Sequence, residues 1–162
     1  AQAGDFVAMS DLVRVEPVAL LPTPAGCAVF LSDGQKVIVF YIDPAIGASI
    51  NAVLSETSSL RPLSHDLFSQ VLEAFGAEVL HATIVRSEGE VFYARLVIKA
   101  ENEIMEKKIV ELDARPSDCL ALALRDEAPV FVVQEVWDSL EDMSETLESL
   151  RNQDDAPGGF GV

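Results

Sequence analysis

The chain has 162 residues, 49% of them apolar, and its 27 acidic and 11 basic side chains give a net charge of −16. This length and composition suit one domain with its own hydrophobic core and exclude a globally disordered chain. The acidic balance repels polyphosphate at long range, which counts against a purely electrostatic nucleic-acid binder.

The first third of the sequence predicts strands joined by a tight turn. Residues 12–20 alternate between apolar and polar, and Pro17, which lacks an N–H, predicts that this strand lies at a sheet edge. The prolines and glycine over 21–26 indicate a loop. The Asp33-Gly34 pair is typical of a hairpin turn, because both residues tolerate positive φ. It predicts that strands within 27–42 pair with each other.

Two helices are predicted next. Asp43 followed by proline is a helix start, and a short helix is expected to run to about Ser55. Ser64 is a suitable N-cap for a second helix, in which Asp66 in the first turn complements the helix dipole. Gly76 is expected just after the C-terminal end of that helix.

The second half predicts a three-stranded meander over 79–85, 91–98 and 106–112. A helix capped by Ser117 follows, and because it is apolar on every side it must be buried. A short strand is expected at 130–133. The predicted fold class is therefore α+β, with antiparallel or mixed sheet meanders and packed helices.

The C-terminal part is predicted to form one acidic amphipathic helix over 135–152 that packs on the α+β domain of residues 1–134. Its apolar seam is formed by Val136, Leu140, Met143, Leu147 and Leu150. Packing of this seam on its own domain is the first interpretation, and self-association into a homo-oligomer is the alternative. Residues 153–162 contain two adjacent glycines and a proline, and we expect a disordered tail there.

The two halves of the sequence resemble each other. Each contains strands, an Arg-Pro turn, a helix and a further strand, with the turns at Arg61-Pro62 and Arg115-Pro116. The similarity is compatible with internal duplication of a strand-strand-strand-helix-strand unit, and also with chance. A duplication would place two helix N-termini in related positions.

The compartment is inferred from the two cysteines and from the lack of a long apolar run. Cys27 and Cys119 lie in apolar segments and are expected to be buried free thiols, which suits a reducing compartment. No Cys or His spacing fits zinc, and no apolar run approaches the roughly 18 residues that a membrane helix needs. We therefore expect a cytoplasmic protein without membrane contact and without an organic cofactor.

The two Arg-Pro turns are candidates for phosphate binding. Helix N-termini attract anions, and arginine binds phosphate through two parallel hydrogen bonds. Arg61, Arg115 and Ser117 would form such a site if both turns face one cleft. Structural ion pairs for the arginines and a helix-capping role for Ser117 are the alternatives.

Acid–base or metal chemistry has four candidates: His65, Asp66, Asp113 and Asp118. A histidine in the first turn of a helix can act as a general base. The alternative is a structural histidine whose hydrogen bonds are made at the helix start. The three carboxylates would suit Mg²⁺ or Mn²⁺, because hard cations favour oxygen ligands. Structural service at the helix N-termini explains Asp66 and Asp118 equally well.

Three segments carry a recognisable pattern. They are Arg61-Pro-Leu-Ser-His-Asp-Leu, Phe92-Tyr-Ala-Arg-Leu and Asp113-Ala-Arg-Pro-Ser-Asp-Cys-Leu-Ala-Leu-Ala-Leu-Arg125. Over roughly residues 28–136 the sequence resembles the bifunctional nuclease domain family of bacteria and plants. Ser64 stands where threonine is usual. Asp43-Pro44-Ala45-Ile46 replaces a more usual Gly-Pro-x-Glu, so a carboxylate often present at that helix start is missing.

The resemblance implies a compact α+β fold and a nuclease that acts on RNA and DNA. The resulting hypothesis assigns catalysis to His65, Asp66 and Asp118, phosphate binding to Arg61, Arg115 and Ser117, and Mg²⁺ or Mn²⁺ to Asp66, Asp113 and Asp118. The alternative is a non-enzymatic regulatory or interaction module whose acidic C-terminal helix binds a basic partner.

Overall fold

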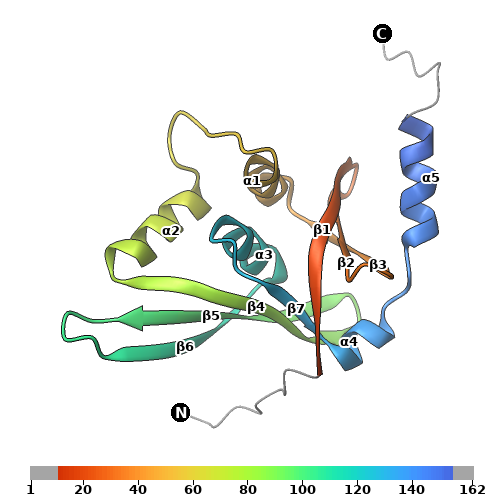
Figure 1. The fold of residues 1–162 in the computed structure, drawn as a ribbon. Helices are drawn as coiled ribbons and strands as arrows, with labels where there is room; N and C mark the ends of the chain where they lie inside the picture. Colours follow the sequence, from red (N-terminus) through yellow and green to blue (C-terminus); the bar gives the residue numbers. More distant parts are fainter. Residues whose placement is uncertain (1–10, 155–162) are drawn as a thin grey trace.

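In the computed structural model, which describes residues 11–154, five helices lie around one seven-stranded mixed sheet (Figure 1). The strands are β1 (Leu12–Thr23), β2 (Gly26–Ser32), β3 (Val37–Ile42), β4 (Ala77–Glu88), β5 (Val91–Glu101), β6 (Lys107–Ala114) and β7 (Val130–Val133). The helices are α1 (Pro44–Leu54), α2 (Ser64–Ala74), α3 (Pro116–Arg125), α4 (Gln134–Ser139) and α5 (Ser144–Asp154). The predicted α+β class is confirmed.

The sheet consists of two antiparallel meanders joined by one short strand. Its order is β3-β2-β1-β7-β4-β5-β6. The short strand β7 pairs antiparallel with β1 and parallel with β4, so it connects the first meander to the second. The predicted meander of the second half is therefore present as β4, β5 and β6.

The prediction of an edge strand at 12–20 and of a loop at 21–26 is wrong, because β1 is internal and runs to Thr23. Its first residues, as far as Val15, pair with β7, and pairing with β2 begins at Glu16. The ladder changes partner there, and its register shifts directly after Pro17. A proline is tolerated inside a sheet at such an irregularity.

Helix α3 lies at the centre of the main core. Its buried side chains are Ser117, Cys119, Leu120, Ala121, Leu122 and Ala123. They pack with apolar residues of β4, β5 and α1, which confirms that the helix with apolar residues on every side is buried. Because α3 is held on several sides, its N-terminus is a fixed point from which side chains can be positioned.

The C-terminal segment forms two helices where one was predicted over 135–152. Between α4 and α5, the Met143 N–H donates to the Val37 carbonyl, 2.7 Å away, and the Asp142 carboxylate accepts from the Val37 N–H. The same carboxylate accepts from the Ser144 N–H at 3.0 Å, in the manner of an N-cap, so a new helix starts at Ser144. This local capping explains why the helix breaks.

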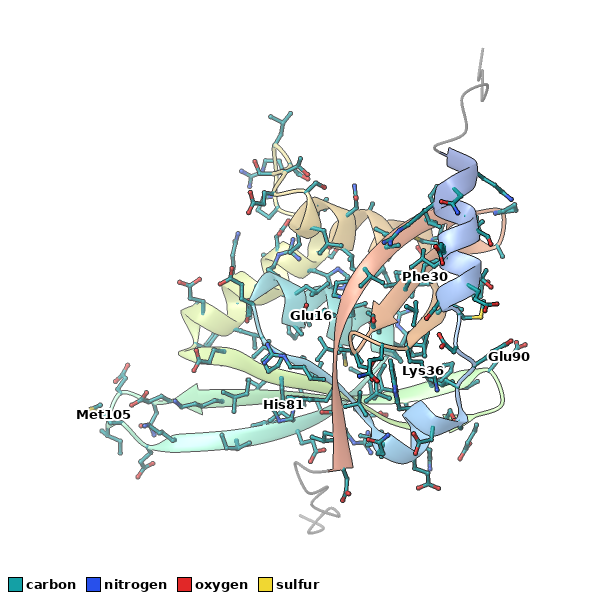
Figure 2. The ribbon with its side chains drawn as sticks, turned by 45° about the vertical axis from the view of Figure 1, so that its right-hand side comes forward. Glu16, Phe30, Lys36, His81, Glu90 and Met105 are labelled. Carbon is teal, nitrogen blue, oxygen red and sulfur yellow. The ribbon has the colours of Figure 1, made fainter. Side chains whose placement is uncertain are left out.

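The apolar seam packs on the domain, as its first interpretation held. Val136 belongs to the main core, and Leu147 belongs to a second cluster with Phe30 and Val37. Figure 2 shows Phe30 on the side of the sheet near α5. Helix α5 reaches Asp154, and the rest of the predicted tail lies outside the described residues. None of the described helices has the length and apolarity to cross a bilayer.

The internal duplication is not confirmed in the form predicted. The helix that directly follows the first meander is α1, which starts at Asp43-Pro44, whereas the helix that directly follows the second is α3, which starts at Arg115-Pro116. Helix α2, with its Arg61-Pro62 turn, stands between α1 and the second meander. The two Arg-Pro turns therefore do not occupy equivalent places in the fold.

We expect Leu147→Ala to lower the free energy of unfolding by about 2–5 kcal/mol, because it removes a buried side chain and leaves a cavity in the second cluster. The exposed Thr146 on the same helix provides the control, and Thr146→Ala should change stability by less than about 0.5 kcal/mol. Urea unfolding measures both. Equal values for the two variants would show that α5 is not part of the cooperative fold.

Candidate active site

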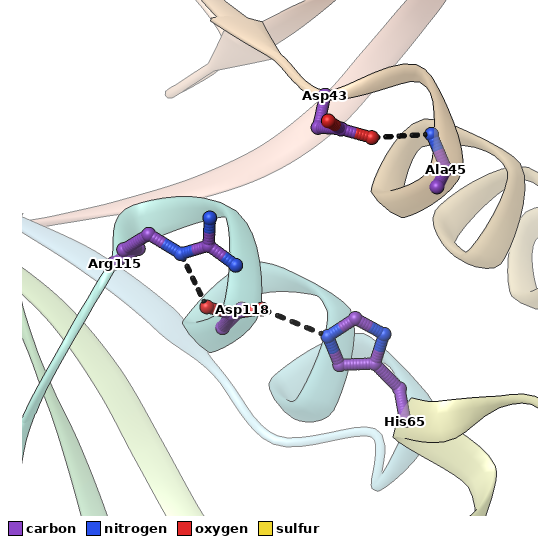
Figure 3. Close-up of polar contacts among 5 residues, drawn as sticks. All are labelled: Asp43, Ala45, His65, Arg115 and Asp118. Carbon is purple, nitrogen blue, oxygen red and sulfur yellow. Dashed lines mark hydrogen bonds and ion pairs between the residues drawn. The ribbon is translucent and has the colours of Figure 1, made fainter.

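The N-termini of α2 and α3 meet through one carboxylate. His65 Nε2 lies 3.0 Å from one oxygen of Asp118, and Arg115 Nε donates to the other oxygen at 2.8 Å (Figure 3). His65 belongs to the first turn of α2, whereas Arg115 and Asp118 belong to the start of α3. We call these three residues the His65–Asp118–Arg115 cluster.

The start of α3 places Asp118 by local rules. Arg115 is the N-cap residue with an extended backbone, and Pro116 follows as the first helical residue. Asp118 therefore lies in the first turn, where a negative charge complements the helix dipole. The prediction that Ser117 caps this helix is wrong, because Ser117 lies within the first turn and is buried. Proline fixes the preceding residue in the extended conformation that an N-cap needs.

The start of α2 is held by a second pair of contacts with α3. The Asp66 carboxylate accepts from the Leu63 N–H at 2.8 Å, and its other oxygen pairs with Arg125 at the far end of α3. Leu63, not the predicted Ser64, is the N-cap residue. Adjacent residues His65 and Asp66 thus reach the two ends of α3. No residue of α2 is fully buried, so these polar contacts carry much of its attachment.

Electrostatics keep Asp118 ionised. Burial by itself raises the pKa of Asp118, but the hydrogen bonds from Arg115 and His65 outweigh it, so the pKa lies below its ordinary value. The hydrogen bond and charge of Asp118 in turn raise the pKa of Arg115. A carboxylate only accepts hydrogen bonds, so the neutral imidazole of His65 carries its proton on Nε2. The lone pair on Nδ1 is then available to accept a proton.

The three carboxylates predicted to bind a metal ion lie in separate ion pairs. Asp118 pairs with Arg115, Asp66 with Arg125, and Asp113 with Arg95 at 2.7 Å. Asp113 is exposed on β6, opposite Arg95 of β5. Within residues 11–154, no group of three or more His, Cys, Asp or Glu side chains is arranged to hold a metal ion. This donor set does not fit Mg²⁺ or Mn²⁺ in the arrangement predicted.

The remaining predicted residues differ in accessibility. Arg61 is exposed in the turn before α2 and forms no ion pair with any residue that the structure describes. Ser117 is buried, so its hydroxyl is poorly placed for a solvent-borne ligand. Cys119 follows Asp118, and burial raises the pKa of its thiol to about 12, which rules out a thiolate nucleophile at neutral pH.

Sequence reasoning did not assign Asp43 to the site. It is the N-cap of α1, where its carboxylate accepts from the Ala45 N–H at 2.8 Å, and it lies across from Arg115 (Figure 3). Its charge adds to the raised pKa of Arg115. The Asp-Pro signal predicted the helix start correctly, but the proximity to Arg115 arises from the packing of α1 on α3.

The cluster lies at the surface. A hollow of about 430 Å³ beside α2 is lined by other residues, including Pro62, Asp66 and Arg125. Within the cluster, the side chain of His65 is 15% exposed and that of Arg115 is 70% exposed. The guanidinium therefore faces solvent while the imidazole is largely enclosed. This arrangement suits a proton-transferring group beside an open anion-binding group.

The lowered pKa of Asp118 predicts a pH-dependent contribution to stability. The contribution is complete above the ordinary carboxyl pKa of about 3.9 and is lost as pH falls through the lower folded-state value. Between about pH 5 and pH 2.5, the free energy of unfolding should therefore fall more steeply for the wild type than for Asp118→Asn. Urea unfolding at each pH measures both slopes. Parallel slopes would contradict the lowered pKa.

Comparison with known proteins gives a family. The model of the bifunctional nuclease domain matches residues 29–144. Two uncharacterized proteins from two strains of Mycobacterium tuberculosis are each 29% identical over 105 residues, or 65% of this chain. The match covers 59% of each relative, so the chain spans only part of their length. The family model covers all three residues of the His65–Asp118–Arg115 cluster and well over half of the chain, and the chain therefore belongs to the bifunctional nuclease domain family.

Proposed function

We propose that the chain hydrolyses phosphodiester bonds of RNA and DNA at the His65–Asp118–Arg115 cluster. The observation that carries this proposal is the single carboxylate of Asp118, which joins a histidine to a solvent-facing arginine at two helix N-termini. Membership of the nuclease domain family supports the reaction class. The proposal assigns proton transfer to His65, its orientation to Asp118 and phosphate binding to Arg115.

The proton-transfer step uses the free nitrogen of the imidazole. Asp118 accepts the Nε2 proton and so fixes both the tautomer and the orientation of the ring. Nδ1 then takes a proton from the attacking water or ribose hydroxyl, and the negative charge of Asp118 stabilises the imidazolium that forms. As the attacking oxygen bonds to phosphorus, the bond from phosphorus to the leaving oxygen breaks. The leaving oxygen takes up the proton from the imidazolium, which restores the neutral ring.

Phosphate binding uses the exposed side of Arg115. Its Nε donates to Asp118, which orients the guanidinium, and the side chain is 70% exposed to solvent (Figure 3). Its two terminal nitrogens can donate to the non-bridging oxygens of a phosphate. The dipole of α3 adds attraction for an anion at the same place. We assign Arg61, in the turn before α2, to the binding of a neighbouring phosphate of the nucleic-acid strand.

The ion-paired carboxylates limit the part that a metal ion can take. Asp66 is committed to Arg125 and to the backbone of Leu63, and we assign it to positioning of His65 in place of direct catalysis. We assign Ser117 a structural role in the first turn of α3, because the residue is buried. No step of the proposed reaction passes through Mg²⁺ or Mn²⁺, and cleavage should therefore persist in EDTA.

Cleavage of fluorescently labelled single-stranded RNA and DNA tests the cluster. We expect His65→Gln and Asp118→Asn to lower kcat/KM by about 100-fold or more, which is the usual contribution of a general base. Arg115→Ala should lower it by weakening phosphate binding. Arg86→Ala is the matched control, because Arg86 is also exposed and paired with a nearby carboxylate, Glu88, but stands on β4 opposite Tyr93 and makes no contact of the cluster. Thermal unfolding verifies that each variant is folded.

Three results would contradict the proposal. Unchanged cleavage by both His65→Gln and Asp118→Asn would show that the cluster is structural. Activity that EDTA abolishes and Mn²⁺ restores would replace the metal-free step by metal chemistry. No cleavage by the wild type would favour the alternative of a non-enzymatic module, in which the acidic face of α4 and α5 binds a basic partner.

A further inference from the structure

Helix α2 exposes an apolar face although its sequence is amphipathic. Leu67, Phe68, Val71 and Phe75 are all exposed, and Phe75 is 80% accessible to solvent. Only Leu72 of this helix packs partly against the main core. An apolar stripe of this kind on a helix is normally buried against a neighbour, so the described part of the chain leaves α2 without one on this face.

One edge of the sheet is also uncovered. Strand β6 ends the sheet, and no described segment pairs with its outer side. It has eight residues, contains no proline, and pairs with β5 without a register shift. The opposite edge, β3, is covered where Met143 bonds to Val37. An open, regular edge strand is a template for pairing with another chain.

Two apolar residues of β6, Val110 and Leu112, lie on the face of the sheet that carries the helices. Val110 and Leu112 of β6 stand directly opposite Ile98 and Leu96 of β5, and both β5 residues are buried in the main core beneath the helices. Directly opposed residues of neighbouring strands point to the same face. Val110 and Leu112 therefore face the helical layer, in which α2 packs on α3 and β4. Figure 2 shows Met105, which is exposed at the tip of the β5–β6 hairpin, far from the helices.

We propose that a second copy of this chain pairs with β6, strand to strand and antiparallel. A twofold axis perpendicular to the sheet, placed where Ile109 of one copy pairs with Ile109 of the other, makes one continuous sheet of the two molecules. Such an axis keeps both helical layers on the same face of the joined sheet. The open edge and the exposed apolar residues of β6 are then covered by one interface.

The charges of β6 complement themselves in this arrangement. Its first two residues are Lys107 and Lys108, whereas Glu111 and Asp113 stand near its end. Antiparallel self-pairing centred on Ile109 places Lys107 of one strand opposite Glu111 of the other at both ends of the seam. This local match opposes the general repulsion between two molecules that each carry a net charge of −16. A basic partner protein would not gain from this match between the two ends of β6.

Sedimentation velocity of the full chain at about 5–200 µM tests the proposal. The wild type is expected at twice the chain mass of 17.5 kDa, and Ile109→Lys is expected to shift it to the monomer. Val91→Lys is the matched control, because Val91 is 56% exposed and Ile109 is 59% exposed, but Val91 lies on β5 beyond the seam. A wild-type monomer over the whole range would overturn the proposal. So would a dimer that Ile109→Lys leaves intact.

A covalent cross-link tests the same contact without relying on a disruptive charge. Paired residues near the axis have Cα atoms about 4.5–5.5 Å apart, within reach of a disulfide. Ile109→Cys should therefore form a cross-linked dimer under mild oxidation, and Val91→Cys should not. The native cysteines are buried and do not compete. Equal cross-linking of both variants, or none at position 109, would reject pairing through β6. Neither experiment depends on the proposed hydrolysis.

Discussion

The Asp118 carboxylate is the contact on which the candidate site depends. It joins the start of α2 to the start of α3 through His65, and it fixes Arg115 at the same time. Helix α3 is anchored by the main core, whereas α2 has no fully buried residue. The position of His65 is thus set by polar contacts made to a rigid helix. The site therefore has one part on α3, which is anchored in the core, and one part on α2, which is attached mainly by polar contacts.

The ion pairs of the site divide the carboxylates into different tasks. Asp118 serves the histidine, Asp66 fixes the beginning of α2, and Asp113 pairs with Arg95 across two strands. Each of these three carboxylates has an arginine partner, and Arg95 also pairs with Glu111. The same division explains why these carboxylates do not gather into a metal-binding group. Asp43 then adds a further negative charge opposite Arg115.

Periodicity and turn residues predicted most of the elements, because these signals are local. The Asp33-Gly34 turn, the start of α1 at Pro44 and the burial of α3 all follow from neighbours in the sequence. Tertiary context decided the rest. Pro17 indicated an edge strand, yet the strand changes partner near that residue and lies inside the sheet.

For the site, the sequence named His65, Arg115 and Asp118 but could not pair them, because that pairing depends on how α2 packs on α3. Arg95 pairs with Asp113 and Arg125 pairs with Asp66. No local sequence pattern indicated that these arginines would pair with the two carboxylates.

The proposed site requires that Asp118 hold the imidazole of His65 with its proton on Nε2. A long-range ¹H–¹⁵N NMR spectrum of the side chains measures this directly, since the chain contains only two histidines. At a pH where the ring is neutral, we expect His65 to have a protonated Nε2 and an unprotonated Nδ1, and we expect Asp118→Asn to alter this pattern. A proton on Nδ1, or a spectrum that is indifferent to Asp118→Asn, would contradict it.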